Sequence, residues 1–404
     1  MPDARRAVPL LAACLLLGFA LVQAVATGHQ EDFFIYRWGS QQAVGGESPY
    51  DIAQVRAAVA VQFPDPEPTP TSFVNNCGYF LPPAATVLFL PFALLPWSAA
   101  KVAWAVTNGL AAYFIARLPW LWNPAPAPRT TPLLLLASVL LVLNPVSLAV
   151  QVVGQSTPVF VGFVAAGLFA FDRGKPYLAA LLWAVPFVKP HLALPLVPLA
   201  CFLGGWRPAA VLVAAVTGLN LAGAWLIGGS PLFLKEYFDF LPATRDAVAY
   251  NRVALNPTIP SWNRLLLAAG GPAIELGLLG TLAGYVVWFG LLVGRCAVAG
   301  TIPARSWVLA AAVTGAVLCS QVLVYELLVL AGVVPWVRDL FAAGQRVRGW
   351  LAVVVLAAES IPHQVLAGFG VEAHHAVGVA VLAGLILTGP LDPTRGPAAA
   401  INSA

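Results

Sequence analysis

Apolar runs of about 18 residues or more recur along almost the whole of this 404-residue chain, beginning with residues 7–27. In lipid every backbone polar group needs a partner inside the protein, and helices satisfy this requirement segment by segment. Only 9% of the residues are charged, whereas a soluble protein carries about 25%. The pattern predicts an all-α, polytopic transmembrane bundle that forms a single integral-membrane domain over residues 1–404.

We expect about twelve spans, because basic residues recur between the apolar segments and basic turns face the cytoplasm. The apolar segments are residues 7–27, 80–96, 98–118, 132–150, 157–171, 176–188, 191–203, 208–228, 273–294, 306–320, 322–337, 349–361 and 371–389. The basic residues are Arg173, Lys175, Arg207, Arg295, Arg305, Arg338, Arg346 and Arg348. The first segment fits an uncleaved helix with a cytoplasmic N-terminus, and the alternative is a signal peptide.

Two long loops are expected on the non-cytoplasmic side. The first, 28–79, has room for short helices at 33–44 and 51–62, and the second is 229–262. Residues 390–404 are expected to form a cytoplasmic tail.

Two apolar segments are expected to be irregular. The segment 80–96 contains four prolines, and an odd number of crossings is needed between residues 80 and 131, so we predict a broken or partial helix there. Segments 176–188 and 191–203 are short for a bilayer of about 30 Å. Their junction, "PFVKPHLALP", is therefore predicted to be unwound or to dip into a cavity.

Composition excludes several classes of function. The net charge of +4 is small and spread along the chain, so nucleic acid is not an expected partner. The five cysteines are scattered, which favours neither a disulfide framework nor a zinc site. The chain has no G-x-G-x-x-G motif and no P-loop, and we expect no metal and no cofactor.

Two adjacent acidic residues, Glu31 and Asp32, stand just after the first apolar run. Charged side chains are costly in a membrane and usually face a cavity or a partner. A carboxylate at this place can deprotonate a hydroxyl acceptor as a general base. The alternative is that both residues form a solvated helix end.

Lys189 and His191 flank a proline between two short apolar halves. A lysine at that depth suits a phosphate, and the alternatives are snorkelling to the headgroups or pairing with a carboxylate such as Glu326. Glu326 follows Tyr325 inside an apolar run, where an ion pair within the bundle and a direct catalytic role are both open.

Polar residues also end two other segments. Gln155 follows Gly154 at an outer helix end, where an amide can bond sugar hydroxyls or simply form a turn. The motif "SWNR" stands at the end of the second long loop. The guanidinium of Arg264 can bind phosphate with two parallel N–H donors, and Trp262 can stack on a sugar or an isoprenoid. The alternative there is an interfacial anchor. We expect Asp32, Lys189 and Arg264 to converge on one cavity.

The order of these segments resembles the glycosyltransferase family 87 membrane enzymes of the GT-C superfamily, over roughly residues 7–340. That family includes polyprenol-phosphate-mannose-dependent mannosyltransferases. The segments that carry the resemblance are "EDFFIYRWGSQQAVGGESPYD", "YFLPPAATVLFLPFALLP", "GQSTPVFVGFVAAGLFAFDRGKPYLAALLWAVPFVKPHLALP", "NPTIPSWNRLL" and "SQVLVYELLVL".

The resemblance implies a donor sugar carried on a polyprenyl phosphate and an acceptor on the non-cytoplasmic face. It implies a general base at Asp32, a phosphate contact at Lys189, and a "GQ" motif at Gln155. "PSWNRLL" departs from the family's Asn-rich wording, and Tyr325 with Glu326 replaces the "YD" or "W.H" of relatives.

On these grounds we assign catalysis to Asp32 and Glu31, and donor phosphate binding to three basic residues, Lys189, His191 and Arg264. Sugar or acceptor binding is assigned to Tyr79, Gln155, Trp262, Asn263, Tyr325 and Glu326.

The expected activity is that of an inverting hexosyltransferase in the plasma membrane, with its site facing the periplasm or the cell exterior. It would move mannose, or another hexose or pentose, from a polyprenyl-phosphate donor to a glycolipid or glycan acceptor. The bilayer is the remaining expected partner. A membrane transporter or lipid flippase is the alternative, since broken helices and buried charge serve transport too. A structural membrane subunit is a third possibility, but it would not need Asp32, Lys189 and Arg264 together.

Overall fold

The computed structural model describes most of the chain, and every regular element in the described part is a helix. The described residues are 4–26, 29–65, 67, 72–122, 131–248, 252–361, 365 and 373–393, without the side chains of 243–247, 278, 324 and 325. The predicted all-α class is therefore confirmed. The expected cytoplasmic tail lies outside the described residues from position 394 onward.

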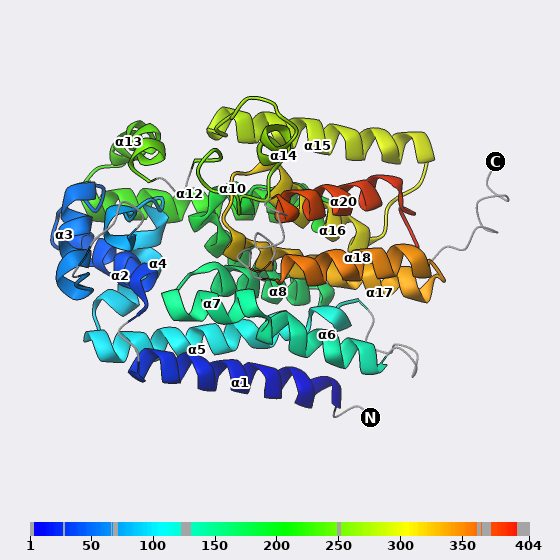
Figure 1. Cartoon of the computed structure of the whole chain (residues 1–404), viewed down its shortest axis with the longest axis horizontal. Helices are drawn as coiled ribbons and strands as arrows, with labels where there is room; N and C mark the ends of the chain where they lie inside the picture. The colour runs from blue at the N-terminus through cyan, green and yellow to red at the C-terminus, as the bar shows by residue number, and fades with distance from the viewer. Residues whose placement is uncertain are drawn as a thin grey trace.

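The longest helices lie side by side along the length of the molecule (Figure 1). In the N-terminal half the elements are α1 (Ala4–Ala26), α2 (Glu31–Val44), α3 (Ile52–Gln62), η1 (Phe73–Asn75), α4 (Ala84–Ala93), α5 (Trp97–Ala116), η2 (Leu118–Trp120), α6 (Thr131–Leu143), α7 (Pro145–Val153), α8 (Thr157–Asp172), α9 (Pro176–Ala184), η4 (Val185–Val188), α10 (Pro190–Ala193) and α11 (Leu196–Gly204). In the C-terminal half they are α12 (Trp206–Gly228), α13 (Phe233–Ala247), α14 (Trp262–Ala268), α15 (Leu278–Ala299), α16 (Arg305–Cys319), η6 (Val324–Val333), α17 (Val334–Ala342), α18 (Arg346–Glu359) and α20 (His374–Thr388).

Four helices in the described part are long and apolar enough to cross a bilayer. They are Ala4–Ala26, Thr131–Val153, Trp206–Gly228 and Leu279–Ala299. Five further apolar helices are shorter, because prolines and polar turns interrupt the apolar runs that we read as spans. The structure thus supports a multi-pass membrane protein, and the total of about twelve spans stays a prediction.

Both segments that we expected to be irregular are broken. α4 has only ten residues, and the chain bends by 118° before the helix that begins at Trp97. The second break lies at Lys189, whose backbone is non-helical between the 3-10 helix η4 and the short helix α10. Pro190 explains this break, because the residue before a proline is disfavoured in the α conformation.

The first long loop contains the two helices expected from its sequence, now seen as α2 and α3. Aromatic packing holds α2 against the bundle. Phe33 is fully buried and its ring stacks on that of Trp104 with centroids 4.9 Å apart. A stacked, buried aromatic pair contributes about 1 kcal/mol beyond the burial of its area. α2 is therefore a fixed part of the fold, and one end of it can carry a precise site.

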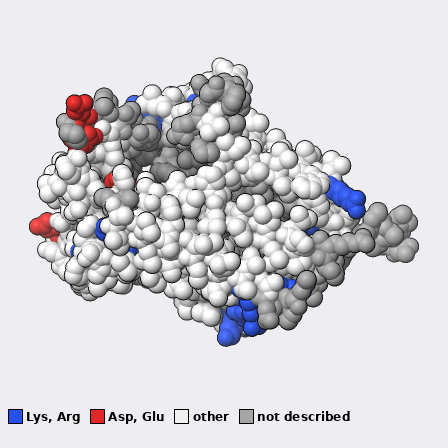
Figure 2. Space-filling model, turned by 60° about the horizontal axis from the view of Figure 1, so that its bottom comes forward, with Lys and Arg blue, Asp and Glu red and all other residues white. Residues whose placement is uncertain are grey.

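Charged groups are unevenly distributed along the molecule. In Figure 1, α2, α3 and α13 lie at the left end of the molecule, and the N-terminus of α1 lies below the bundle to the right of centre. On the face in Figure 2, the visible acidic atoms are confined to the end with α2 and α3, and the largest basic groups lie away from it.

Arg338, one of the basic residues used to predict the cytoplasmic turns, has a structural role that the sequence did not indicate. It is buried in α17, where its guanidinium pairs with Asp339 and donates to the carbonyl oxygens of Pro119 and Leu121. The sequence shows a basic residue near a turn, but these two carbonyl partners lie more than 200 positions away along the chain.

Candidate functional site

The candidate site lies where α2 closely contacts the C-terminal end of α7. α7 ends at Gly154, which has a left-handed backbone with φ of 73°. A Cβ atom at this position would lie 2.7 Å from the Cβ of Phe33, so only glycine allows both the conformation and the approach. The next residue, Gln155, is thereby placed beside the first turn of α2, which carries Asp32.

The Gln155 amide is nearly fully buried and joins three elements. Its Nε2 donates to the Oδ2 of Asp32 at 3.0 Å. Its Oε1 accepts from the hydroxyl of Tyr36 at 2.7 Å and from the ammonium of Lys189 at 3.1 Å. Gln155, in the turn before α8, therefore connects Asp32 and Tyr36 of α2 to Lys189 in the broken segment.

The Lys189 ammonium is the centre of this group. Besides Gln155, it donates to the hydroxyl of Thr157 at 3.0 Å and to the Oε1 of Glu326 at 2.7 Å. An ammonium has three N–H donors, so these acceptors engage all of them. The side chains of Lys189 and Glu326 are each only 7% exposed, which makes this a buried ion pair.

Glu326 has further partners on both of its oxygens. Its Oε2 accepts from the backbone N–H of Leu323 at 3.0 Å, and the Nε2 of His191 lies 3.6 Å from its Oε1. The side chain of His191 is 37% exposed, so it is the most accessible basic group here. Of the alternatives for Lys189, the structure shows the pairing with Glu326.

Asp32 lies outside the four candidate spans and is partly buried. Burial of its carboxyl raises its pKa from 3.8 to about 7. The positive charge of Lys189 opposes this rise, the negative charges of Glu31 and Glu326 add to it, and the Gln155 hydrogen bond opposes it. A carboxylate with a pKa near neutrality can accept a proton in the physiological range.

Glu31 is turned to other partners. Its Oε1 lies 2.8 Å from the Nδ1 of His29, and its Oε2 accepts from the backbone N–H of Gln30. Gln30 is a non-glycine residue with a left-handed backbone, φ 93°, directly before the two carboxylates. Such conformations are uncommon outside glycine and often occur at functional sites.

The other predicted site residues lie in two separate places. Tyr79 is fully buried against Gly39 of α2 and Tyr50, and its hydroxyl has no hydrogen-bond partner among the described residues. Asn263 and Arg264 are buried in α14, where Arg264 donates to the carbonyl of Val253 in its own loop at 3.3 Å.

The structure does not test the roles of these residues, and the convergence of Arg264 with Asp32 stays a prediction. Trp262 begins α14 and is half-buried, whereas the side chain of Tyr325 lies outside the described residues.

Ser320 and Gln321, to which the sequence analysis assigned no role, join the segment of Lys189 and His191 to α14. Ser320 donates to the backbone oxygen of His191 at 2.9 Å, as does the hydroxyl of Tyr285 at 2.6 Å. Gln321 accepts from Asn263 at 3.2 Å and donates to Glu275. The signal was a Ser-Gln pair interrupting an apolar run.

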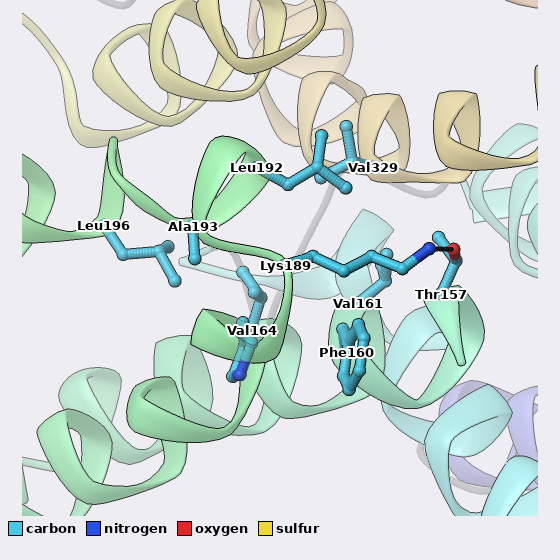
Figure 3. A pocket seen from close by; sticks show the side chains of 10 residues that line it. Thr157, Phe160, Val161, Val164, Lys189, Leu192, Ala193, Leu196 and Val329 are labelled. Atoms are coloured by element: carbon cyan, nitrogen blue, oxygen red, sulfur yellow. Dashed lines mark hydrogen bonds between the residues drawn. The ribbon is translucent and has the colours of Figure 1, made fainter. Parts of the chain in front are cut away.

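A narrow apolar pocket lies along the stem of Lys189 (Figure 3). The Lys189 ammonium reaches past Val161 and Phe160 to Thr157 at one end, and Leu196 lies at the other. The lining residues are Thr157, Phe160, Val161, Val164, Pro186, Lys189, Leu192, Ala193, Leu196 and Val329. Only Thr157 and Lys189 bring polar side chains to it.

Comparison with known families decides the class of protein. Residues 79–324 match the model of glycosyltransferase family 87, which is more than half of the chain. The chain belongs to glycosyltransferase family 87. The family predicted from the sequence is therefore confirmed. The predicted range, roughly residues 7–340, is wider than the matched range. The matched range of this glycosyltransferase includes Gln155 and Lys189, but it begins after Asp32 and ends just before Glu326. No curated protein and no solved structure matches the chain.

Proposed function

We propose that this membrane glycosyltransferase moves a sugar from a polyprenyl-phosphate donor to a hydroxyl of a glycolipid or glycan acceptor, with inversion at the anomeric carbon. The observation that carries the proposal is the group of polar side chains in which Asp32 is bonded through Gln155 to Lys189. The sugar is a hexose or a pentose, and mannose is favoured only by the family.

Asp32 is the proposed general base. The acceptor hydroxyl loses its proton to the Asp32 carboxylate as its oxygen attacks the anomeric carbon, and the bond to the donor phosphate breaks at the same time. Direct displacement by one nucleophile inverts the anomeric centre. A pKa of about 7 leaves enough carboxylate at neutral pH to accept the proton.

The leaving group is a lipid phosphate, whose negative charge grows as the bond breaks. Cations and hydrogen-bond donors at its oxygens stabilise that charge. We assign this role to His191 and Lys189, with Arg264 as a further candidate. A phosphate at the mouth of the pocket would replace Thr157 as one acceptor of the Lys189 ammonium.

The resemblance to the family favours a lipid-linked donor. The apolar pocket beside Lys189 has room for about one water molecule, so it does not itself hold the isoprenoid chain. We keep Trp262, Asn263, Tyr325 and Glu326 as candidates for binding the sugar and the acceptor. Tyr79 is fully buried elsewhere, against Gly39 and Tyr50.

The proposed location is the plasma membrane, with the site facing the periplasm or the cell exterior. The proposal rests on the basic residues expected in cytoplasmic turns, which would leave Asp32 at the start of α2 on the other side. The family match favours the glycosyltransferase over the transporter or flippase alternative, although buried carboxylates and ion pairs occur in transporters too.

The test is incubation of the purified protein with a panel of polyprenyl-phosphate sugars and membrane lipids, followed by mass spectrometry. Single-turnover rates at saturating donor then compare Asp32→Asn with Glu31→Gln. Loss of a positioned base costs about 10²–10⁴-fold, so Asp32→Asn is expected to lose transfer by that factor. Glu31→Gln is expected to keep a measurable fraction, because Glu31 bonds to His29. Transfer by Asp32→Asn at the wild-type rate would reject Asp32 as the base.

A further inference from the structure

The orientation of the Gln155 amide follows from its hydrogen bonds. Its Oε1 accepts from the Tyr36 hydroxyl, from the Lys189 ammonium and from the backbone N–H of Ser156, at 2.7, 3.1 and 2.9 Å. An ammonium and a backbone N–H can only donate, so the amide oxygen faces them. The NH₂ group is thereby directed at Asp32, and it donates to the Oδ2 atom at 3.0 Å.

The partners of this amide are themselves fixed. Lys189 is held by Thr157 and Glu326, and Glu326 is held in turn by the backbone of Leu323. Gln155 is only 5% exposed, which leaves little room for a sugar hydroxyl to replace any of these contacts. The amide therefore forms a rigid link between α2 and the buried ion pair.

We propose that Gln155 is a positioning residue, whose amide holds the Asp32 carboxylate in one orientation and couples it to the Lys189–Glu326 ion pair. This role rests on the proposed function, in which Asp32 is the base, and it replaces the sugar-binding role assigned to Gln155 from the sequence.

The electrostatics of Asp32 give the proposal a measurable consequence. The titratable groups that face this carboxyl are Glu31 on its own helix, Lys189 before α10, Glu326 on η6 and Cys77 in the loop before α4. Hydrogen bonds to the charged form of a carboxyl lower its pKa, and a like charge at the same distance raises it. Changing Gln155 therefore moves the protonation midpoint of Asp32 upward.

The experiment uses the full-length protein in detergent and two variants. Gln155→Met keeps the length of the side chain without its polar atoms, and Gln155→Glu puts a carboxyl group where the amide was. A carbodiimide modifies protonated carboxyl groups, so peptide mass spectrometry of the modified residue 32 at a series of pH values reports its midpoint without any need for turnover. We expect midpoints higher than that of the wild type in both variants, by about one unit in Gln155→Glu.

A matched control lies one turn earlier on α7. Gln151 is also buried, and its amide donates to the side-chain oxygen of Asn108. The variant Gln151→Met is expected to leave the midpoint of Asp32 unchanged, because no bond links it to α2.

A second readout is the pH dependence of transfer. Its acidic limb is expected to move by the same amount in the Gln155 variants. Equal midpoints for residue 32 in the wild type and both Gln155 variants would overturn the proposal. If the wild type transfers no sugar from any polyprenyl-phosphate donor, the proposed function fails, while a shifted midpoint still establishes the link between Gln155 and Asp32.

Discussion

The buried pair of Lys189 and Glu326 predicts a large coupling between two neutralising substitutions. In Lys189→Met, Glu326 keeps its charge in a place where its side chain is only 7% exposed. Removing one partner of a buried ion pair costs about 3–5 kcal/mol, because the other charge is left uncompensated. Glu326→Gln leaves Lys189 with Gln155 and Thr157 as acceptors, so its expected cost is about 2–3 kcal/mol.

The double variant Lys189→Met/Glu326→Gln removes both charges together. Its glutamine keeps an oxygen that can accept from the N–H of Leu323. The hydrogen bonds of the ammonium to Gln155 and Thr157 are lost, but no uncompensated charge is left behind. We expect it to be about 2–4 kcal/mol more stable than the sum of the single effects predicts. Its transfer activity is still expected to be absent, since the cation beside Gln155 is gone.

The assay is a double-mutant cycle on the free energy of unfolding, measured by denaturant titration in detergent with the tryptophan signal. If the losses of unfolding free energy in the two single variants simply add up in the double variant, the idea that the ion pair is desolvated is refuted. Tyr177→Phe is a suitable neutral control, because Tyr177 is exposed at the start of α9.

Two further predictions concern the base and its placement. Transfer is expected to rise about tenfold per unit as the pH increases toward 7 and to level above it, since the carboxyl accepts a proton only after losing its own; a rate that is constant from pH 5 to 9 would contradict this assignment. Gly154→Ala is expected to reduce transfer by about 10²-fold, because the new Cβ would push Phe33, and with it α2, away from Gln155. Its control is Gly229→Ala, which has the same left-handed backbone but open space around it, and which should lose about 1 kcal/mol of stability without this loss of activity. Equal activity in the two glycine variants would contradict the close contact as the device that positions Asp32.

The sequence allows a good prediction of the broken helices, because their cause is local. Pro190 lies beside Lys189, and the four prolines of 80–96 lie within the segment that they interrupt. The helices α2 and α3 are also predictable, because the residues that form each helix are consecutive in the sequence. The family could also be named from the order of the short motifs, without any knowledge of contacts.

The hydrogen-bond partners could not be predicted in the same way. Gln155 meets Asp32 across 123 positions, and the contact depends on how Gly154 packs on Phe33. The sequence alone left several roles open for Lys189, including pairing with Glu326, and the structure shows that this pair forms. Tyr285 in α15 and Ser320 just after α16 were missed because a lone hydroxyl in or beside an apolar helix has no spacing that points to a distant backbone oxygen.

The ion pair of Lys189 and Glu326 also has a consequence for biosynthesis. The two residues are 137 positions apart in the chain. At synthesis rates of about 5–20 residues per second, Glu326 follows Lys189 after roughly 7–27 seconds. During this interval the lysine lacks the carboxylate with which it pairs directly in the fold, and an isolated lysine in mid-bilayer costs about 3 kcal/mol. The segment around Pro190 therefore has to wait near water, or inside the insertion machinery, until η6 arrives. The final placement of this segment is a late step in the maturation of the enzyme.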